Sequence, residues 1–266
     1  MNKNINTKVK KFHQFIVVEK GPVNTAIIDL LKGNVYQVEN NVIDTLEKGA
    51  YREIPGFIAS AAAEGLLIEV NEKNWIPADE NAEVETEDNE IGIELHVEGG
   101  IDLEAVLETF KDYTIYNVVF YGRELPEIPA YPVEIIKKEK NFQQCTANAK
   151  VDANFDRVTE SFYLFNKKYN CCWGGKVAIT REGKIRPCIY SSIVAGDIDK
   201  DAPGEILEKL KKYWTITKDK VEKCKECELR YVCFDCREIA CRKGDNLFSA
   251  HPLCSYDPCK GKWQGE

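Results

Sequence analysis

The chain has 266 residues, of which 44% are hydrophobic and 30% charged, which is typical of a globular protein with one large or two small domains. Its formal net charge of −8 argues against nonspecific nucleic-acid binding, which depends on basic side chains neutralising phosphates. No apolar run reaches the roughly 18 residues of a membrane span, and the first 20 residues lack the apolar stretch of a signal peptide. We therefore expect a cytoplasmic protein with neither a nucleic-acid nor a membrane partner.

Residues 1–78 predict a small α+β lobe. A strand pair is expected over 26–38, with its turn at Gly33–Asn34, because both residue types tolerate a positive φ. A short helix capped by Asn41 should follow, then a helix opened by Pro55 and a strand over 66–70. Two short helices and several strands in this length indicate a lobe of winged-helix type.

An acidic connector follows the lobe. Residues 79–90 contain seven carboxylates and no aromatic residue. Such a run cannot bury enough apolar surface to become ordered, so we expect a solvated linker. An acidic docking surface is the alternative.

Residues 91–168 begin as an α/β segment. Strands are expected over 91–97, 117–121 and 133–136. The helix expected over 102–110 places its apolar residues on one face. Strand–helix–strand at this spacing predicts a small parallel sheet.

The eleven cysteines are the most informative feature of the composition. In a chain without an export signal, clustered cysteines favour metal or catalytic chemistry over disulfides, and an odd number leaves one thiol unpaired. Cys145 stands alone. The last 43 residues contain seven cysteines: Cys224, Cys227, Cys233, Cys236, Cys241, Cys254 and Cys259.

A hairpin should bring two further cysteines together. Strands are expected over 176–180 and 184–189, and Gly183 suits the left-handed position of the turn between them. Cys172 and Cys188 would then lie near each other. Taken alone, this pattern suits a surface hairpin with two incidental cysteines as well as it suits a metal site.

Two CxxC pairs in the tail favour the metal site. A CxxC turn lets both thiolates point at one centre, as zinc and iron–sulfur sites require. One four-thiolate site would use both pairs, and two sites become plausible when Cys172, Cys188 and Cys254 are included. Cations nearby would lower the pKa of the thiols and offset the negative charge of their thiolates: Lys218, Lys220, Lys223, Lys225, Arg230 and Arg237.

Five tracts of the C-terminal region are informative together. They are Gly183-Lys184-Ile185 leading to Cys188, Gly196-Asp197-Ile198, Ile216-Thr217-Lys218-Asp219-Lys220, the segment from Cys224 to Arg237, and Cys254-Ser255-Tyr256-Asp257-Pro258 before Gly261-Lys262-Trp263. With these tracts, residues 170–264 resemble the SPASM domain, the auxiliary iron–sulfur module of many radical-SAM peptide-modifying enzymes. The resemblance is closest to the SPASM-type peptide maturases of grasp-with-spasm systems.

The resemblance implies two [4Fe–4S] clusters. Carried over position by position, one cluster would be bound by Cys224, Cys227, Cys233 and Cys254. The other would receive Cys172, Cys188 and Cys236, with Cys171, another cysteine or an open site for substrate as its fourth position. The spacing Cys233-x2-Cys236 departs from the CxxxC of many SPASM domains. Cys241 and Cys259 stand where the family has no ligand, either as a substitute ligand or as spare thiols.

The chain lacks the CxxxCxxC motif that holds the catalytic cluster of radical-SAM enzymes. The interval between the connector and Cys172 is also too short for an eight-fold (β/α) barrel, which needs about 200 residues or more. We therefore do not expect a radical-SAM catalyst. The resemblance instead implies an accessory protein that acts with an ATP-grasp-type peptide ligase on a ribosomally synthesised precursor peptide, by binding substrate or relaying electrons.

The N-terminal lobe is similar to small winged-helix peptide-recognition domains, which add a leader peptide as a strand to a sheet edge. The alternative is a structural lobe without a partner. No HExxH pairing accompanies the three histidines, His13, His96 and His251, so a hydrolytic zinc site is not expected. His251 either caps or ligates a cluster or packs beside it.

Two other functions stay open at this stage. One is a zinc-binding scaffold without redox chemistry, because zinc and iron–sulfur sites both use thiolates. The other is a peptide-modifying enzyme of unnamed reaction. The sequence thus predicts a mixed α+β and α/β protein of four parts: a winged-helix-like lobe over 1–78, a linker over 79–90, a reduced βαβ segment over 91–168, and a SPASM-like domain over 169–266.

Overall fold

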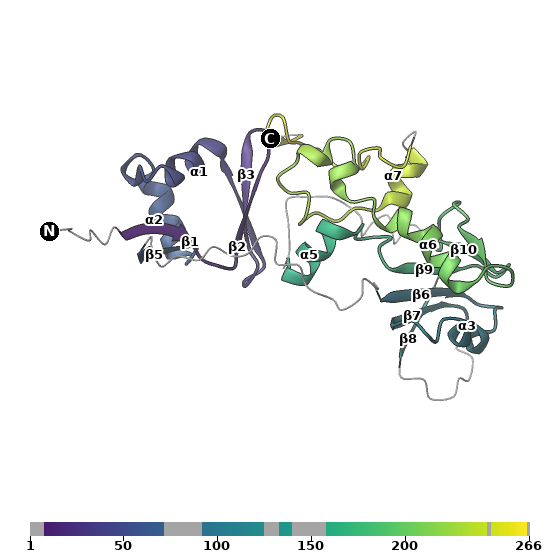
Figure 1. Ribbon diagram of the computed structural model, residues 1–266. Helices are drawn as coiled ribbons and strands as arrows, with labels where there is room; N and C mark the ends of the chain where they lie inside the picture. The colour runs from purple at the N-terminus through teal and green to yellow at the C-terminus, as the bar shows by residue number, and fades with distance from the viewer. Residues whose placement is uncertain (1–7, 72–91, 125–132, 140–157, 244–245, 265–266) are drawn as a thin grey trace.

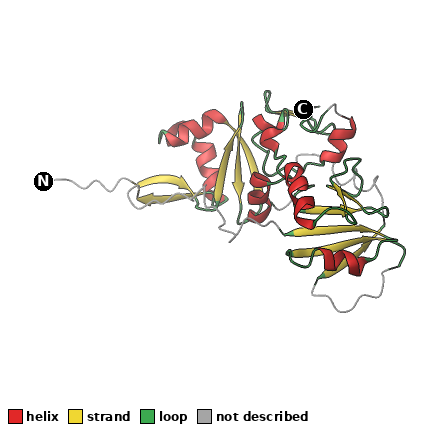
Figure 2. Cartoon of the chain, turned by 45° about the vertical axis from the view of Figure 1, so that its right-hand side comes forward, coloured by secondary structure: helices red, strands yellow, loops and turns green. Residues whose placement is uncertain are grey.

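The computed structural model describes residues 8–71, 92–124, 133–139, 158–243 and 246–264, and shows a mixed α/β protein with several sheets (Figure 1). The predicted linker over 79–90 and Cys145 lie outside the described residues. The N-terminal lobe and the largest sheet occupy opposite ends of the molecule, and helices and loops fill the region between them (Figure 2). Within the described residues, no helix is both long and apolar enough to cross a membrane.

The N-terminal lobe consists of two small antiparallel sheets and two α-helices. The helices end at glycines in the left-handed conformation, as at Gly49 and Gly65, with φ of 73° and 74°. Pro55 occupies the first turn of its helix, as predicted. In chain order the elements are β1 (Lys8–Phe12), β2 (Ile16–Lys20), β3 (Asn24–Asp29), β4 (Asn34–Glu39), α1 (Asn40–Glu47), the 3₁₀ turn η1 (Tyr51–Glu53), α2 (Pro55–Ala63) and β5 (Leu67–Asn71).

The strand pair predicted over 26–38 is confirmed as β3 and β4, with Gly33 in its turn at φ 77°. The predicted cap of α1 was wrong. Glu39, at the end of β4, holds the extended N-cap conformation, so the chain passes from strand to helix without a loop. Asn41 lies inside the helix and donates to Glu39 Oε2 at 3.1 Å instead.

The largest sheet has six strands in the order β11-β10-β9-β6-β7-β8. Strands β6, β7, β8 and β9 run parallel, as the βαβ pattern predicted, while β9, β10 and β11 are antiparallel neighbours. The bounds are β6 (Ile93–Glu98), β7 (Ile115–Tyr121), β8 (Glu134–Lys138), β9 (Lys176–Ile179), β10 (Lys184–Arg186) and β11 (Gly196–Asp197).

Helices α3 (Leu103–Thr109) and α6 (Pro203–Trp214) cover one face of this sheet. The residues of α3 predicted to form its apolar face are all buried, and Asp102 caps the helix by accepting from Glu104 N at 3.0 Å. The same apolar core includes Cys172, Cys188 and Cys236. The core of the sheet therefore extends directly to one set of predicted ligands.

The remaining elements of the Cys-rich region are short. They do not stack into layers, and most of the chain between them consists of turns and loops. These elements are α5 (Glu160–Lys168), η3 (Lys218–Lys220), η4 (Cys224–Glu226), α7 (Arg237–Lys243), β12 (Tyr256–Asp257) and β13 (Lys262–Trp263).

The N-terminal lobe docks on the Cys-rich tail through its three-stranded sheet. Arg230 pairs with Glu19 on β2 at 2.7 Å, and Gln37 on β4 donates to the fully buried Glu228 at 2.8 Å. The β12–β13 turn lies beside β3 (Figure 1), where Asn24 Nδ2 donates to the carbonyl of Gly261 at 3.0 Å. An apolar cluster that includes side chains of β3, α5 and the tail reinforces the contact.

Replacing Gly21 with alanine should disturb this docking. A Cβ at Gly21 would stand 2.4 Å from Glu228 Oε2, and Glu228 is held in place by Gln37 and Tyr256. We expect the free energy of unfolding to fall by about 1–3 kcal/mol, as for overpacking elsewhere. Urea unfolding measures this. Gly56→Ala is the control, since nothing lies within 4 Å of its Cβ, and an equal loss in both variants would contradict the clash.

Candidate functional site

Three cysteines form what we call the first thiol group: Cys172, Cys188 and Cys236. All three are buried, with 7%, 6% and 1% of their surface exposed. A hydrogen bond to Cys236 and burial raise the pKa of the Cys172 thiol, and Cys188 lies near enough to add to the effect. Burial likewise raises the pKa of Cys188. The β9–β10 hairpin thus brings Cys172 and Cys188 together, as predicted.

Four cysteines form the second thiol group: Cys224, Cys227, Cys233 and Cys254. Cys224 interacts electrostatically with Cys233 and Cys254, and Cys227 interacts with Cys224 and Cys233. Burial raises the pKa of Cys224 to about 12 and raises those of Cys227 and Cys233. Such thiols are protonated at neutral pH, so binding a metal here would release protons.

Local backbone bonds position each group. Asn170 Oδ1 accepts from the backbone N–H groups of Cys172 and Trp173, both at 2.9 Å, which fixes the turn entering the first group. In the second group, the tight turn η4 places Cys227 N 2.9 Å from the carbonyl of Cys224. This turn is the geometry that the CxxC spacing predicted.

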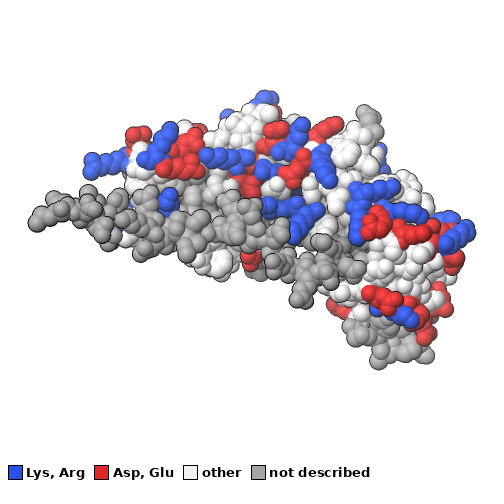
Figure 3. All heavy atoms as spheres, in the orientation of Figure 1, with Lys and Arg blue, Asp and Glu red and all other residues white. Residues whose placement is uncertain are grey.

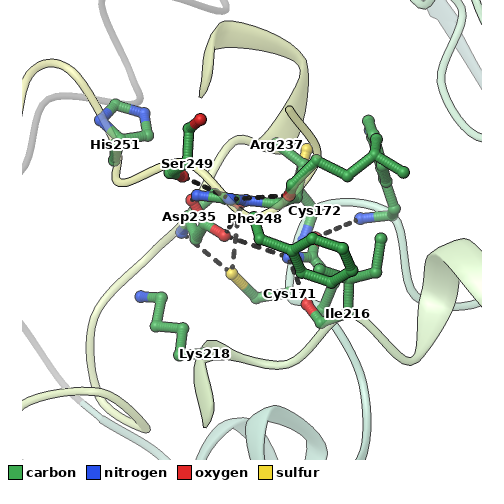
Figure 4. Close-up of polar contacts among 12 residues, drawn as sticks. Cys171, Cys172, Ile216, Lys218, Asp235, Arg237, Phe248, Ser249 and His251 are labelled. Atoms are coloured by element: carbon green, nitrogen blue, oxygen red, sulfur yellow. Dashed lines mark hydrogen bonds and ion pairs between the residues drawn. The ribbon is translucent and has the colours of Figure 1, made fainter. Parts of the chain in front are cut away.

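Asp235 and Arg237 form a buried ion pair (Figure 4). Arg237 and Asp235 are 0% and 1% exposed, and Arg237 Nε lies 2.5 Å from Asp235 Oδ2. Asn170 Nδ2 donates to the same carboxylate at 3.2 Å, and the Asp235 N–H points at the sulfur of Cys171 at 3.1 Å. Arg237 also donates to the carbonyl of Ser249 at 2.8 Å. One ion pair therefore connects three separate segments.

Lys218 is a buried cation of the site, only 5% exposed. Its ammonium donates to the carbonyl of Cys233. Burial opposes the charge, but nearby Cys233, Cys171 and Asp235 act against burial and raise the pKa of Lys218. A charge kept in this position suits a site that accumulates negative charge.

Only two of the four lysines noted in the sequence contact the second group. Lys223 Nζ lies 3.1 Å from the carbonyl of Cys254 and 3.8 Å from its sulfur. Lys218 contacts Cys233 as described. Lys220 instead donates to the carbonyl of Thr215 at 2.8 Å, and Lys225 is exposed.

The other cysteines are placed as follows. Cys171 faces Asp235 and Lys218 rather than the first group, and its pKa is raised by burial to about 12. Cys241 lies on α7, half-buried, with Cys236 among its electrostatic neighbours. Cys259 is exposed at the turn between β12 and β13. All ten described cysteines are free thiols.

His251 lies beside the ion pair, and Figure 4 shows it and Lys218 on opposite sides of Asp235. It is 4% exposed, and burial lowers its pKa, so the ring is neutral. Its Nδ1 accepts from Leu253 N at 3.3 Å, which leaves the proton on Nε2. Because Nδ1 accepts this bond and Nε2 carries the proton, neither ring nitrogen offers a free lone pair to a metal, which argues against ligation by His251.

A second polar cluster on the large sheet was not predicted. His96 Nδ1 lies 2.8 Å from the Tyr121 hydroxyl, and His96 Nε2 lies 3.0 Å from Glu94. Burial lowers the pKa of His96 to about 4, and the His96 hydrogen bond, acting against burial, helps lower that of Glu94 to about 2. The sequence signal for this cluster was the spacing of Glu94 and His96 on one predicted strand, because residues two positions apart on a strand face the same side of the sheet.

The buried ion pair should be essential for stability. Arg237→Met leaves the Asp235 carboxylate buried without its cation, and we expect the free energy of unfolding to fall by about 3–5 kcal/mol. Denaturant unfolding of the metal-free protein measures the loss. Lys200→Met, which removes an exposed ion pair to Asp197, should cost less than about 1 kcal/mol. Similar small losses in both variants would refute a central role for the pair.

Within each predicted ligand set the thiols interact electrostatically, but Cys171 also interacts with Cys233 and Cys241 with Cys236, so these interactions do not single out the predicted sets. The donor set, thiols with cations nearby, is of the kind that binds zinc or an iron–sulfur cluster. Among the described residues, no three His, Cys, Asp or Glu side chains are arranged to hold a single metal ion. Comparison of the chain with protein-family models, with curated proteins and with solved structures gave no match.

Proposed function

We propose that this chain is a SPASM-type iron–sulfur accessory protein in the cytoplasm, with one [4Fe–4S] cluster at each thiol group. The observation that carries the proposal is that Cys172 and Cys188 interact with Cys236, and Cys254 with Cys224, although these residues lie up to 64 positions apart in the sequence. Thiolate-ligated clusters supply electron transfer when bound, and they suit buried sites with hydrogen-bond donors nearby.

The proposed partners are a ribosomally synthesised precursor peptide and an ATP-grasp-type peptide ligase. The N-terminal lobe supports peptide binding, because its three-stranded sheet β2-β3-β4 has edges to which an extended peptide could add. The same sheet contacts Glu228, the residue after Cys227, so a peptide bound there would lie near the second thiol group. On the face in view, basic and acidic side chains are intermixed (Figure 3).

A zinc-binding scaffold is the second candidate. It is favoured by the docking of the N-terminal lobe on the tail around Cys227 and Cys254, because a closed four-thiolate zinc site would lock that contact. The scaffold needs no redox chemistry and would hold the peptide or its ligase in place.

Metal analysis separates the two candidates. Protein purified without oxygen should be brown, absorb near ~400 nm and contain roughly eight iron and eight sulfide per chain, as two Cys-ligated [4Fe–4S] clusters require. Absorption, iron, sulfide and zinc are measured on one sample. A colourless protein with one or two zinc ions would exclude the redox function and support the scaffold.

Cysteine variants test the ligand sets. Cys224→Ala, Cys227→Ala, Cys233→Ala or Cys254→Ala should each lose one cluster, about half of the iron, because a thiolate ligand is removed. Cys259→Ala is the matched control, since this thiol is exposed, and Cys241→Ala should also keep nearly all metal. Full metal retention in any of the first four variants would contradict the assignment, and loss in Cys241→Ala would make Cys241 a ligand.

A further inference from the structure

The two thiol groups differ in the cations that surround them. At the second group, Lys218 donates to the carbonyl of Cys233 and Lys223 contacts both the carbonyl and the sulfur of Cys254. Neither ammonium forms an ion pair with a carboxylate in the part of the chain that the structure describes. Both positive charges are therefore available to the thiol group.

Lys223 also has an unusual backbone. Its φ of 64° is the only positive φ of a non-glycine residue in the described ranges. A positive φ is unfavourable for a residue with a side chain, and such strain concentrates at functional sites where surrounding contacts maintain it. Here the strained residue is the one whose ammonium contacts Cys254.

At the first group, the nearby charges cancel. Lys176 interacts with Cys172 and Cys188, but it also pairs with Glu94 at 3.7 Å. Glu238, which lies near Cys188, pairs with Arg242 at 2.6 Å. The first group is thus surrounded by balanced pairs.

Exposure differs in the same direction. Taken as whole residues, the first-group cysteines are buried and the four of the second group are half-buried, although burial raises the thiol pKa values of Cys224, Cys227 and Cys233 as well. Two carboxylates oppose this trend: Glu228 raises the pKa of Cys227, and Asp235 raises those of Cys224 and Cys233, although Asp235 is paired with Arg237. The Glu228 carboxylate accepts hydrogen bonds from Gln37 and from the Tyr256 hydroxyl. Its single negative charge is outnumbered by the two ammonium groups of Lys218 and Lys223.

We propose that, of the two clusters, the one at the second thiol group has the higher reduction potential, and that Lys218 and Lys223 are the positioning residues that raise it. The inference rests on the proposed function. Reduction adds one negative charge to a cluster, and cations that are not paired with a carboxylate stabilise that charge. The balanced ion pairs at the first group stabilise it less.

The test is a reductive titration of the full chain with dithionite, followed by electron paramagnetic resonance. Wild-type protein should show two waves at different potentials. Lys218→Met and Lys223→Met should each shift the higher-potential wave to more negative values and leave the lower wave in place. Lys220→Met is the matched control, because this lysine of the same short helix bonds Thr215 rather than a cysteine, and it should shift neither wave.

The outcomes are distinguishable. If Lys223→Met retains its iron and sulfide but shifts the lower wave, or shifts neither, the proposal is overturned. Lys223 is partly exposed, so this variant decides the matter even if Lys218→Met, at a buried position, fails to fold. A wild-type protein without iron would instead overturn the proposed function, and the iron analysis shows this before any titration.

Discussion

The buried Asp235–Arg237 pair is the interaction on which the Cys-rich region depends. Asp235 contacts Asn170 and Cys171, and Arg237 holds the carbonyl of Ser249, so the pair joins segments more than sixty residues apart along the chain. Cysteines of both thiol groups lie on or beside these segments. A region with so little regular structure needs such a centre, because short turns alone do not fix the distances between its loops.

The parts of the fold that the sequence predicted are those in which local pattern decides structure. Alternation and turn glycines located the hairpins, and the apolar spacing of α3 located its buried face. The cap at Asn41 was mispredicted because β4 runs straight into α1, which a capping preference cannot anticipate. The proximity of Cys172 and Cys188 followed from the hairpin itself, whereas the two ligand sets rest on the resemblance and stay a prediction.

Features that depend on distant contacts could not be predicted. Four lysines near the CxxC pairs are equivalent in sequence, and only folding shows that Lys218 and Lys223 approach cysteines while Lys220 does not. The contact of Cys171 with Asp235 could not be predicted either. Cys171 and Cys172 are adjacent in sequence, yet Cys171 contacts Asp235 whereas Cys172 contacts Cys236. The spacing of cysteines predicts the local geometry of one turn, but it does not predict which turns come into contact in the folded chain.

The position of the β12–β13 turn beside β3 has a consequence for the order of events during synthesis. Asn24 bonds Gly261, and Gln37 bonds Glu228 and Tyr256, so one face of the N-terminal sheet is completed by residues made about two hundred positions later. That face stays uncovered on the ribosome while the intervening chain is translated. Closing so long a loop is slow, which makes this interval the period when the nascent chain is most open to aggregation or to chaperone binding.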